Sequence, residues 1–326
     1  MRKLNWAILG PGWIGCDFAA DFPHDIGNLY AVGSRSLERA QEVAKKYGIT
    51  KAYGDYEELL RDPEVDVVYV ATPNDSHYRY MMLSLQHGKH VLCEKAITVN
   101  GQQLREVKEL AAQKGLVVAE AMTIFHMPLY EELSKIIKAG KIGEFKMVQV
   151  AFGSCKEYDV NNRFFNPDLG GGALLDIGTY ALSFARYFLS SAPDSVLTTV
   201  KRFETGVDEC SGIILKNKED EMSVVTLTMR ARMPKRGVVT GDEGYIVVDN
   251  YPRATKATIV YNDGTSEEVT ASQERPALAC EAIYMTQCVA EGRPNHTLGW
   301  TTDVLSIMDE VTRQWEASCP WAGPAQ

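Results

Sequence analysis

Residues 5–15 read Asn5-Trp6-Ala7-Ile8-Leu9-Gly10-Pro11-Gly12-Trp13-Ile14-Gly15, an apolar strand that runs directly into the spacing G-x-G-x-x-G. The first glycine permits a tight turn, and the second lets a diphosphate approach the backbone. The third lets the following helix lie close to the strand. That helix directs its N-terminal N–H groups at the phosphates. We therefore predict a dinucleotide-binding turn, with cofactor contacts from Gly10, Gly12, Trp13, Ile14 and Gly15.

The end of the next predicted strand, residues 28–33, indicates which dinucleotide is bound. NAD-binding chains carry an acidic residue about 20 residues beyond the glycines, where it accepts a hydrogen bond from the ribose 2′-OH. This chain has Ser34 there, with Arg35 beside it and Arg39 one helical turn later. A hydroxyl and two guanidinium groups bind a 2′-phosphate, which a carboxylate would repel. We expect NADP; the alternative is that both arginines are solvated charges at the start of a helix.

Length and composition restrict the class of protein. The 326 residues allow two domains with full cores, and the net charge of −9 argues against nucleic acid or an anionic membrane as a partner. No apolar run approaches the roughly 20 residues that span a bilayer. The seven cysteines form no C-x-x-C pair, and the six histidines have no metal-ligand spacing. These features predict a cytoplasmic protein with reduced thiols and no metal centre.

Strand and helix patterns alternate up to about residue 121. Residues 65–71 form a near-continuous apolar run, which is typical of a strand buried on both faces of a parallel sheet. Further buried strands are expected at residues 88–95 and 116–121. Such repeated units predict a doubly wound Rossmann sheet over residues 1–121. Ligands of these sheets lie beyond the carboxyl ends of the strands, where Thr72 and Lys95 fall.

From about residue 144 the pattern changes to short strands separated by turns. The predicted strands are residues 145–152, 195–202, 211–216, 222–229, 237–240, 245–248, 256–260 and 266–270. The predicted helices of this part are residues 128–139, 178–189, 278–291 and 302–317. We therefore predict an α/β protein, in which the first domain is followed by an α+β domain over residues 122–326 with a large, open, mostly antiparallel sheet.

Two segments carry candidate catalytic groups. Glu94 and Lys95 end a strand, and residues 170–180 form a glycine-rich loop that enters a helix with Asp176 and Tyr180 four residues apart, on one face. Oxidation of an alcohol needs a group that takes the hydroxyl proton. A tyrosine, with an ordinary pKa of about 10, becomes a usable base near a cation such as Lys95. The alternative is that Tyr180 is a half-buried helix aromatic and Lys95 a solvated charge.

Four stretches together resemble the Gfo/Idh/MocA oxidoreductase family over essentially the whole chain. They are residues 10–15 (GPGWIG), residues 72–74 (TPN) with His77, residues 90–95 (HVLCEK) and residues 170–180 (GGGALLDIGTY). Within this family the chain is most similar to the dimeric dihydrodiol dehydrogenases, which also act as NADP-dependent D-xylose 1-dehydrogenases. Residues 51–59 and 203–208 resemble segments of that subgroup.

The resemblance implies roles for individual residues. Lys95 corresponds to the active-site lysine that contacts nicotinamide and substrate, and Asp176 to the acid of the second motif. Tyr180 stands where many members carry histidine and the dihydrodiol subgroup carries tyrosine. The resemblance also implies a homodimer through the C-terminal sheet. The family's Glu-Lys-Pro is Glu94-Lys95-Ala96 here. A non-proline cis bond costs about 2.5–4 kcal/mol, so we expect a trans peptide before Ala96.

The remaining candidates lie at strand ends and in loops. The other cofactor contacts predicted are Thr72, Pro73, Asn74, His77, Glu94 and Lys95. The alternative for His77 is that it simply stands at the start of a helix and does not contact the cofactor. Asn161 and Arg163 lie in the loop before the glycine-rich segment. Two interpretations of these residues are open: they contact a polyol substrate, or they form a surface salt bridge. Phe125 and Phe152 are candidate substrate contacts, although aromatic residues at such places more often belong to the core.

The sequence thus predicts an NADP(H)-dependent oxidoreductase that acts on a sugar or a cyclic diol. Hydride from the substrate carbon goes to nicotinamide C4 while Tyr180, helped by Lys95, accepts the hydroxyl proton. Two alternatives stay open. One is an NADPH-dependent reductase of a keto or anhydro sugar, since sequence does not fix the direction of reaction. The other is a catalytically silent regulator that senses NADP.

Overall fold

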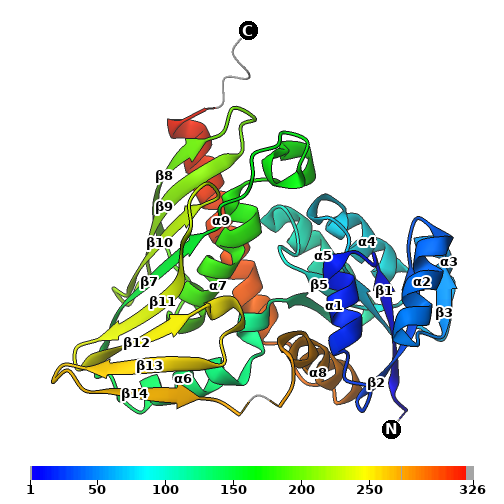
Figure 1. Ribbon diagram of the computed structural model, residues 1–326, viewed down its shortest axis with the longest axis horizontal. Coiled ribbons are helices and arrows are strands. Elements are labelled where there is room, and N and C mark those ends of the chain that lie inside the picture. Colours follow the sequence, from blue (N-terminus) through cyan, green and yellow to red (C-terminus); the bar gives the residue numbers. More distant parts are fainter. Residues whose placement is uncertain (1, 273, 321–326) are drawn as a thin grey trace. The chain divides into compact units, whose positions relative to one another are not determined.

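The computed structural model describes residues 2–272 and 274–320, which form two compact units (Figure 1). The first unit runs to residue 123 and also includes residues 275–298; the second comprises residues 124–274 and the chain from residue 299 on. The predicted boundary at residue 121 lies next to this division. Residues 275–298, which the prediction assigned to the second domain, belong instead to the first unit.

The first unit is built on a six-stranded parallel sheet in the order β3-β2-β1-β4-β5-β6. Its strands are β1 (Leu4–Leu9), β2 (Gly27–Gly33), β3 (Lys51–Tyr53), β4 (Val67–Val70), β5 (His90–Glu94) and β6 (Val118–Ala121). β1 and β4 are almost wholly buried, as expected of central strands covered on both faces. The predicted doubly wound sheet is confirmed.

Among the described residues, six helices accompany this sheet. They are α1 (Trp13–Asp21), α2 (Leu37–Tyr47), α3 (Tyr56–Arg61), α4 (Asn74–Gln86), α5 (Gly101–Lys114) and α8 (Ala277–Ala290). Helix α8 lies beside α1 (Figure 1) and adds Leu278, Ala282 and Met285 to the core cluster that contains Trp6 and Phe18. Burial of these apolar side chains explains why α8 belongs to the first unit despite its late place in the chain.

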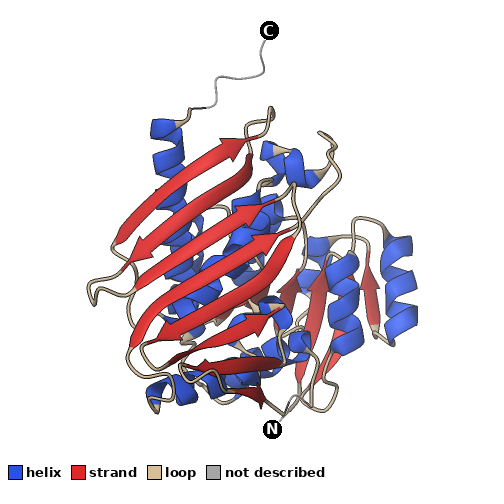
Figure 2. Cartoon of the chain, turned by 60° about the vertical axis from the view of Figure 1, so that its left-hand side comes forward, coloured by secondary structure: helices blue, strands red, loops and turns tan. Residues whose placement is uncertain are grey.

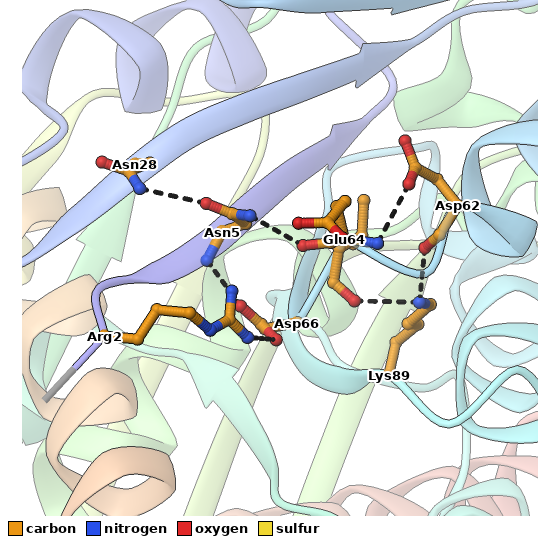
Figure 3. Close-up of polar contacts among 8 residues, drawn as sticks. Arg2, Asn5, Asn28, Asp62, Glu64, Asp66 and Lys89 are labelled. Carbon is orange, nitrogen blue, oxygen red and sulfur yellow. Dashed lines mark hydrogen bonds and ion pairs between the residues drawn. The ribbon is translucent and has the colours of Figure 1, made fainter.

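Polar contacts fasten the amino ends of the central strands (Figure 3). The backbone N–H of Asn5 donates to the Asp66 carboxylate at 2.8 Å, and its side chain donates to the Glu64 carbonyl at 2.8 Å. The buried Lys89 ammonium donates to two backbone carbonyls, the nearer one that of Asp62 at 2.7 Å. Burial lowers the pKa of Lys89. These contacts tie β1 and β5 to the loop before β4 and leave the opposite strand ends for a ligand.

The second unit contains an eight-stranded sheet in the order β14-β13-β12-β11-β7-β10-β9-β8 (Figure 2). Its strands are β7 (Phe145–Gly153), β8 (Ser195–Arg202), β9 (Asp208–Lys216), β10 (Met222–Thr228), β11 (Met233–Gly241), β12 (Gly244–Asp249), β13 (Lys256–Tyr261) and β14 (Ser266–Thr270). The pair β7–β10 is parallel and the other neighbours are antiparallel. The predicted open, mostly antiparallel sheet is confirmed.

Helices lie behind one face of this sheet (Figure 2). The helices are α6 (Pro128–Lys138), α7 (Thr179–Phe188) and α9 (Thr297–Ser318). Short 3-10 turns occur at Thr123–Phe125, Arg163–Phe165, Pro167–Leu169 and Tyr251–Arg253. A π turn at Leu174–Gly178 directly precedes α7. Helix α7 packs on β7, β10 and β11. A Cβ at Gly237 would lie 2.2 Å from the Phe184 ring, so this glycine lets α7 approach β11. Across the described residues, no helix combines the length and apolarity that a membrane span requires.

Candidate active site

The three glycines of the turn after β1 have different surroundings. Gly10 has a φ of +92°, and a Cβ there would lie 2.9 Å from the Ala71 carbonyl oxygen. A Cβ at Gly15 would lie 2.5 Å from the Gly10 carbonyl oxygen. A Cβ at Gly12 would meet nothing within 4 Å. The fold therefore requires the first and third glycines, whereas the second leaves open space above the start of α1.

Helix α1 begins at Trp13, directly after this open space. The first N–H groups of a helix have no partner within the helix, and together with the helix dipole they favour an anion. Trp13 is exposed over 76% of its surface, and Ile14 is half-buried. The predicted glycine turn thus has both the space and the donors that a dinucleotide diphosphate needs.

The loop after β2 holds the side chains predicted to select the cofactor. Ser34 is buried, and its hydroxyl accepts a hydrogen bond from the Ser36 N–H at 3.3 Å. The Arg39 guanidinium donates to the Pro11 carbonyl at 3.4 Å, which places it at the glycine turn, and it also pairs with Glu42 at 3.2 Å. Arg39 and the turn therefore meet in the first unit.

Arg35 is exposed and lines a cavity of about 250 Å³ between the starts of α2 and α3 and the middle of α4. Arg79 lines the same cavity together with Tyr56 and Tyr80, whose rings meet edge to face at 4.9 Å. Sequence reasoning missed Arg79. It sits on an exposed helix face, where an arginine is ordinarily solvated, and only the pairing of α3 with α4 brings it to the same cavity as Arg35.

His77 connects two predicted cofactor loops. Its ring is fully buried, and its two nitrogens lie 2.8 Å from the Thr72 carbonyl oxygen and 2.9 Å from the Ala96 carbonyl oxygen. Burial lowers the pKa of His77, although both carbonyls favour the protonated ring. With both nitrogens engaged by backbone, His77 holds the loop after β4 against the segment after β5. Its predicted contact with the cofactor stays a prediction.

The peptide between Lys95 and Ala96 is cis, so the expectation of a trans bond was wrong. Contacts fix the backbone after this bond on both sides. The Ala96 carbonyl meets His77, and the Ile97 N–H donates to the Glu120 carboxylate at 3.1 Å. Sequence reasoning missed Glu120, which gives no signal beyond being an acid inside an apolar strand.

Lys95 itself is half-buried at the end of β5. The preceding Glu94 is buried and accepts hydrogen bonds from the Tyr69 hydroxyl and, at 3.2 Å, from the Lys95 N–H. Glu94 therefore braces the backbone that presents the lysine. The structure brings Lys95, Glu94, His77 and Thr72 together at the carboxyl edge of the parallel sheet, as the sequence predicts.

In the second unit the glycine-rich loop is closely packed. A Cβ at Gly171 would lie 2.8 Å from the carbonyl oxygens of Arg163 and Asn166, so the loop that carries Arg163 wraps directly over it. The segment after the loop is a π turn over Leu174–Gly178, followed by α7. The sequence predicted an ordinary helical spacing between Asp176 and Tyr180. Single π turns occur frequently at functional sites.

Asp176 is almost buried and faces the Arg163 guanidinium, with 3.5 Å between Oδ1 and the nearest nitrogen. Tyr180 is half-buried, and its ring centroid lies 6.3 Å from that of the buried Phe152. Two of the four predicted substrate contacts, Arg163 and Phe152, thus adjoin the candidate catalytic side chains. The Asn161 side chain bonds with Asp159 at 3.2 Å.

The fourth predicted contact, Phe125, packs on the Trp300 ring at 5.3 Å and is buried. No cluster of three or more His, Cys, Asp or Glu side chains suited to a metal ion occurs in the part of the chain that the structure describes.

Family comparisons match both units. A model described as oxidoreductase family, NAD-binding Rossmann fold, matches residues 4–122, and one described as GFO/IDH/MocA C-terminal domain matches residues 130–247. The trans-1,2-dihydrobenzene-1,2-diol dehydrogenase of Xenopus laevis is 33% identical, over 95% of this chain and 97% of its own length. The protein of the same name from Danio rerio is 32% identical, over 95% and 96%.

Solved structures share the fold at lower identity. A 3-ketoreductase from Actinomadura kijaniata, in complex with NADP, superposes with a TM-score of 0.83 at 22% identity and covers 96% of this chain and 97% of its own. A levoglucosan dehydrogenase, in complex with NADH and levoglucosan, gives a TM-score of 0.85 at 21% identity, with 96% and 97% covered.

The fold and the two family matches define an NAD(P)-binding oxidoreductase with a Rossmann domain and an α+β domain. The chain belongs to the Gfo/Idh/MocA family, in agreement with the resemblance seen in the sequence. The predicted class, a dehydrogenase, is likewise confirmed by the names of its relatives.

Proposed function

We propose that this chain is an NADP(H)-dependent dehydrogenase that oxidises a CH–OH group of a sugar or a cyclic diol. The observation that carries the proposal is the match, over nearly full length, to relatives named trans-1,2-dihydrobenzene-1,2-diol dehydrogenase. The braced Lys95 at the end of β5 and the pair Asp176 and Tyr180 support it, because they are the groups that such a reaction needs.

NADP is the proposed cofactor. Ser34 stands where an NAD-specific chain carries an acid. Arg39 at the glycine turn and Arg35 in the neighbouring cavity supply positive charge for a 2′-phosphate. One of the solved relatives binds NADP and another NADH, so family membership by itself favours neither dinucleotide.

The proposed mechanism assigns the proton to Tyr180. When bound, the nicotinamide supplies the hydride acceptor. Tyr180, as a phenolate, takes the proton of the substrate hydroxyl while the carbon–hydrogen bond breaks, and a carbonyl forms. Asp176 accepts a hydrogen bond from a substrate hydroxyl and so orients it. Phe152, beside Tyr180, is the proposed apolar wall of the substrate site.

The reductive direction is the second candidate function. The same residues run in reverse when Tyr180 donates a proton to a carbonyl oxygen, and two solved structures with this fold are a 3-ketoreductase and a levoglucosan dehydrogenase. An NADPH-dependent reductase of a keto or anhydro sugar therefore needs no change in the roles of Lys95, Asp176 and Tyr180.

The test is a change in absorbance at the reduced-nicotinamide band. Purified protein is mixed with NADP or NAD and with D-xylose, other aldoses, cyclic polyols and trans-cyclic diols, and NADPH is offered with the matching carbonyls. We expect turnover with NADP and an aldose or diol. Binding of NADP without turnover in either direction would overturn the enzyme proposal and leave the nucleotide sensor. Faster turnover with NAD would overturn the cofactor assignment.

We also propose a homodimer, formed through the uncovered face of the large sheet (Figure 2). This face carries apolar side chains on adjacent strands: the exposed Leu197 is opposite the exposed Ile214, and Ile214 is opposite the half-buried Val224. Leu197 is exposed over 63% of its surface and Ile214 over 42%. Exposed apolar patches mark interaction surfaces, and family members commonly pair through this sheet.

A cytoplasmic location completes the proposal. All seven cysteines are free thiols in the structure, which suits a reducing compartment. Pyridine-nucleotide turnover also needs the cofactor pool of the cell interior. Fractionation of cells that express a tagged full-length chain tests this location.

A further inference from the structure

One buried carboxylate holds the start of the segment that carries Asp176 and Tyr180. Asp208 is the first residue of β9 and is only 6% exposed. Its Oδ2 accepts a hydrogen bond from the backbone N–H of Leu174 at 2.8 Å. Leu174 is the first residue of the π turn that continues into α7. A carboxylate of one strand therefore caps a helical segment from a distant part of the sequence.

Gly172 makes this contact possible. Its φ is +107°, and a Cβ there would lie 2.1 Å from Asp208 Oδ1. The second carboxylate oxygen thus occupies the space that a side chain would fill. Position 172 therefore requires glycine for two reasons: the Asp208 carboxylate lies too close for a side chain, and the loop has a positive φ there.

The hairpin before Asp208 is fixed by its own contacts. The Phe203 N–H donates to the Val207 carbonyl at 2.8 Å, and the Gly206 N–H donates to the Phe203 carbonyl at 3.0 Å. Arg202 lies opposite Asp208 on β8 and donates to the Gly206 carbonyl at 2.8 Å. Asp208 is thus presented from a rigid turn, so its position dictates where the π turn begins.

We propose that Asp208 is a positioning residue, whose carboxylate fixes the π turn so that Asp176 and Tyr180 keep the orientation that proton transfer requires. The inference rests on the proposed function of those two residues. A carboxylate at the start of a helical segment binds the N–H groups there more strongly than a neutral side chain does. Asp208 acts on these two side chains through the backbone of the π turn, at Leu174.

The electrostatics separate this role from a purely structural one. Burial raises the pKa of Asp208 to about 6, although the Leu174 N–H and the Arg202 charge lower it. Since this pKa lies above the value of about 3.9 in the unfolded chain, the contribution of Asp208 to stability falls as the pH rises from about 4 to about 6 and stays at the lower level above pH 6. If Asp208 served only to stabilise the fold, a neutral side chain at this position would give a more stable protein at neutral pH.

The experiment compares Asp208→Asn with the wild type and with Glu209→Gln, which neutralises the next carboxylate of β9, one that pairs with Lys201 at 2.7 Å. At pH 7.5 we expect Asp208→Asn to keep or raise the melting temperature while kcat falls about tenfold, as the loss of a charged hydrogen bond predicts. The Kd for NADP should change less than about twofold, since the proposed cofactor groups lie in the first unit. Glu209→Gln should leave the melting temperature, kcat and the Kd for NADP unchanged.

Hydrogen exchange provides a readout that does not depend on catalysis. In Asp208→Asn the peptide covering residues 172–182 should exchange faster, and the peptides of β9 should not. A second variant, Gly172→Ala, places a Cβ where the Asp208 carboxylate lies and so disrupts the same contact. It should accelerate exchange in the same peptide. If the wild type turns over no substrate, the proposed function fails and the exchange data still decide the positioning role. Unchanged kcat and exchange in Asp208→Asn, or a parallel fall of kcat and melting temperature, would overturn the proposal.

Discussion

At the scale of single residues, the glycine turn separates the needs of the fold from those of the ligand. Gly15 has no room for a side chain because the Gly10 carbonyl is 2.5 Å away from where its Cβ would lie, whereas Gly12 has room in the protein alone. We therefore predict that Gly12→Ala keeps the melting temperature within about 2 °C but weakens NADP binding at least about tenfold. Gly15→Ala should lower the melting temperature and also weaken NADP binding.

Thermal unfolding and quenching of tryptophan fluorescence by NADP measure the two effects on the same samples. Gly48→Ala serves as a control remote from the turn, because a Cβ there meets nothing within 4 Å but the residue has a φ of +68°. This control should cost stability and leave NADP affinity unchanged. Equal loss of stability in Gly12→Ala and Gly15→Ala would contradict the division of roles.

Cofactor selection is a second residue-scale question. Arg35 and Arg79 line one cavity, and Arg39 already has a carbonyl and a carboxylate as partners. We predict that Arg35→Ala raises the Kd for NADP about tenfold and leaves the Kd for NAD unchanged, because only NADP carries the 2′-phosphate. Arg2→Ala, which breaks an exposed pair with Asp66 away from this cavity, is the matched control. Parallel weakening of both dinucleotides would show that Arg35 does not read the phosphate.

At the scale of elements, the short strand β3 depends on Asp62. The Asp62 carboxylate accepts hydrogen bonds from Lys51 Nζ at 2.8 Å and from the Tyr53 hydroxyl at 2.6 Å. Burial alone would raise the pKa of Asp62, but these bonds outweigh it and hold the pKa well below its usual range. The stability contributed by Asp62 is therefore complete above its unfolded pKa of about 3.9 and declines as the pH falls below it.

We predict that Asp62→Asn lowers the free energy of unfolding by about 1.5–3 kcal/mol at pH 7, the usual value of a hydrogen bond to a charged group. The loss should become smaller as the pH falls toward 3, because the unfolded wild type then takes up a proton at Asp62 that the folded protein does not. Urea unfolding across this range gives the difference directly. A loss that stays constant with pH would refute the role of the ionised carboxylate.

The same scale shows what patterns in the sequence predict. Apolar runs in the sequence predicted the central strands of the parallel sheet, because a strand that is buried on both faces has apolar residues at nearly every position. Of β11, only residues 237–240 were predicted, because the charged Lys235 and Arg236 in its first half interrupt the apolar pattern. The π turn before α7 was missed, since one extra residue in a turn leaves helical periodicity nearly unchanged.

At the scale of the whole molecule, the proposed dimer gives a testable prediction. Ile214→Lys places a charge in the middle of the apolar face of the large sheet. Light scattering of the wild type should give about twice the 36.2 kDa of one chain, and the variant should give the mass of one chain. Lys216→Glu, at the end of the same strand, is the charge-changing control and should remain a dimer. A wild type that is monomeric at micromolar concentration would contradict the proposed interface.

Long-range contacts mark the limit of prediction for the molecule as a whole. Helix α8 follows the large sheet in sequence, yet its Leu278 and Met285 belong to the core of the first unit. The role of Asp208 depends on a contact across 34 residues. The candidates Lys95, Asp176 and Tyr180 stand in motifs that are local in sequence, whereas Asp208 comes from a distant strand and leaves no local pattern.

The central claim is that Tyr180 takes the substrate proton in an NADP-dependent oxidation. The most direct test is the steady-state rate of NADP reduction by Tyr180→Phe, with the best substrate found for the wild type. We predict that kcat falls by about 10²–10⁴-fold, the usual contribution of a general base, while the Kd for NADP stays within about twofold. A variant that keeps a rate within a few-fold of the wild type would contradict the account.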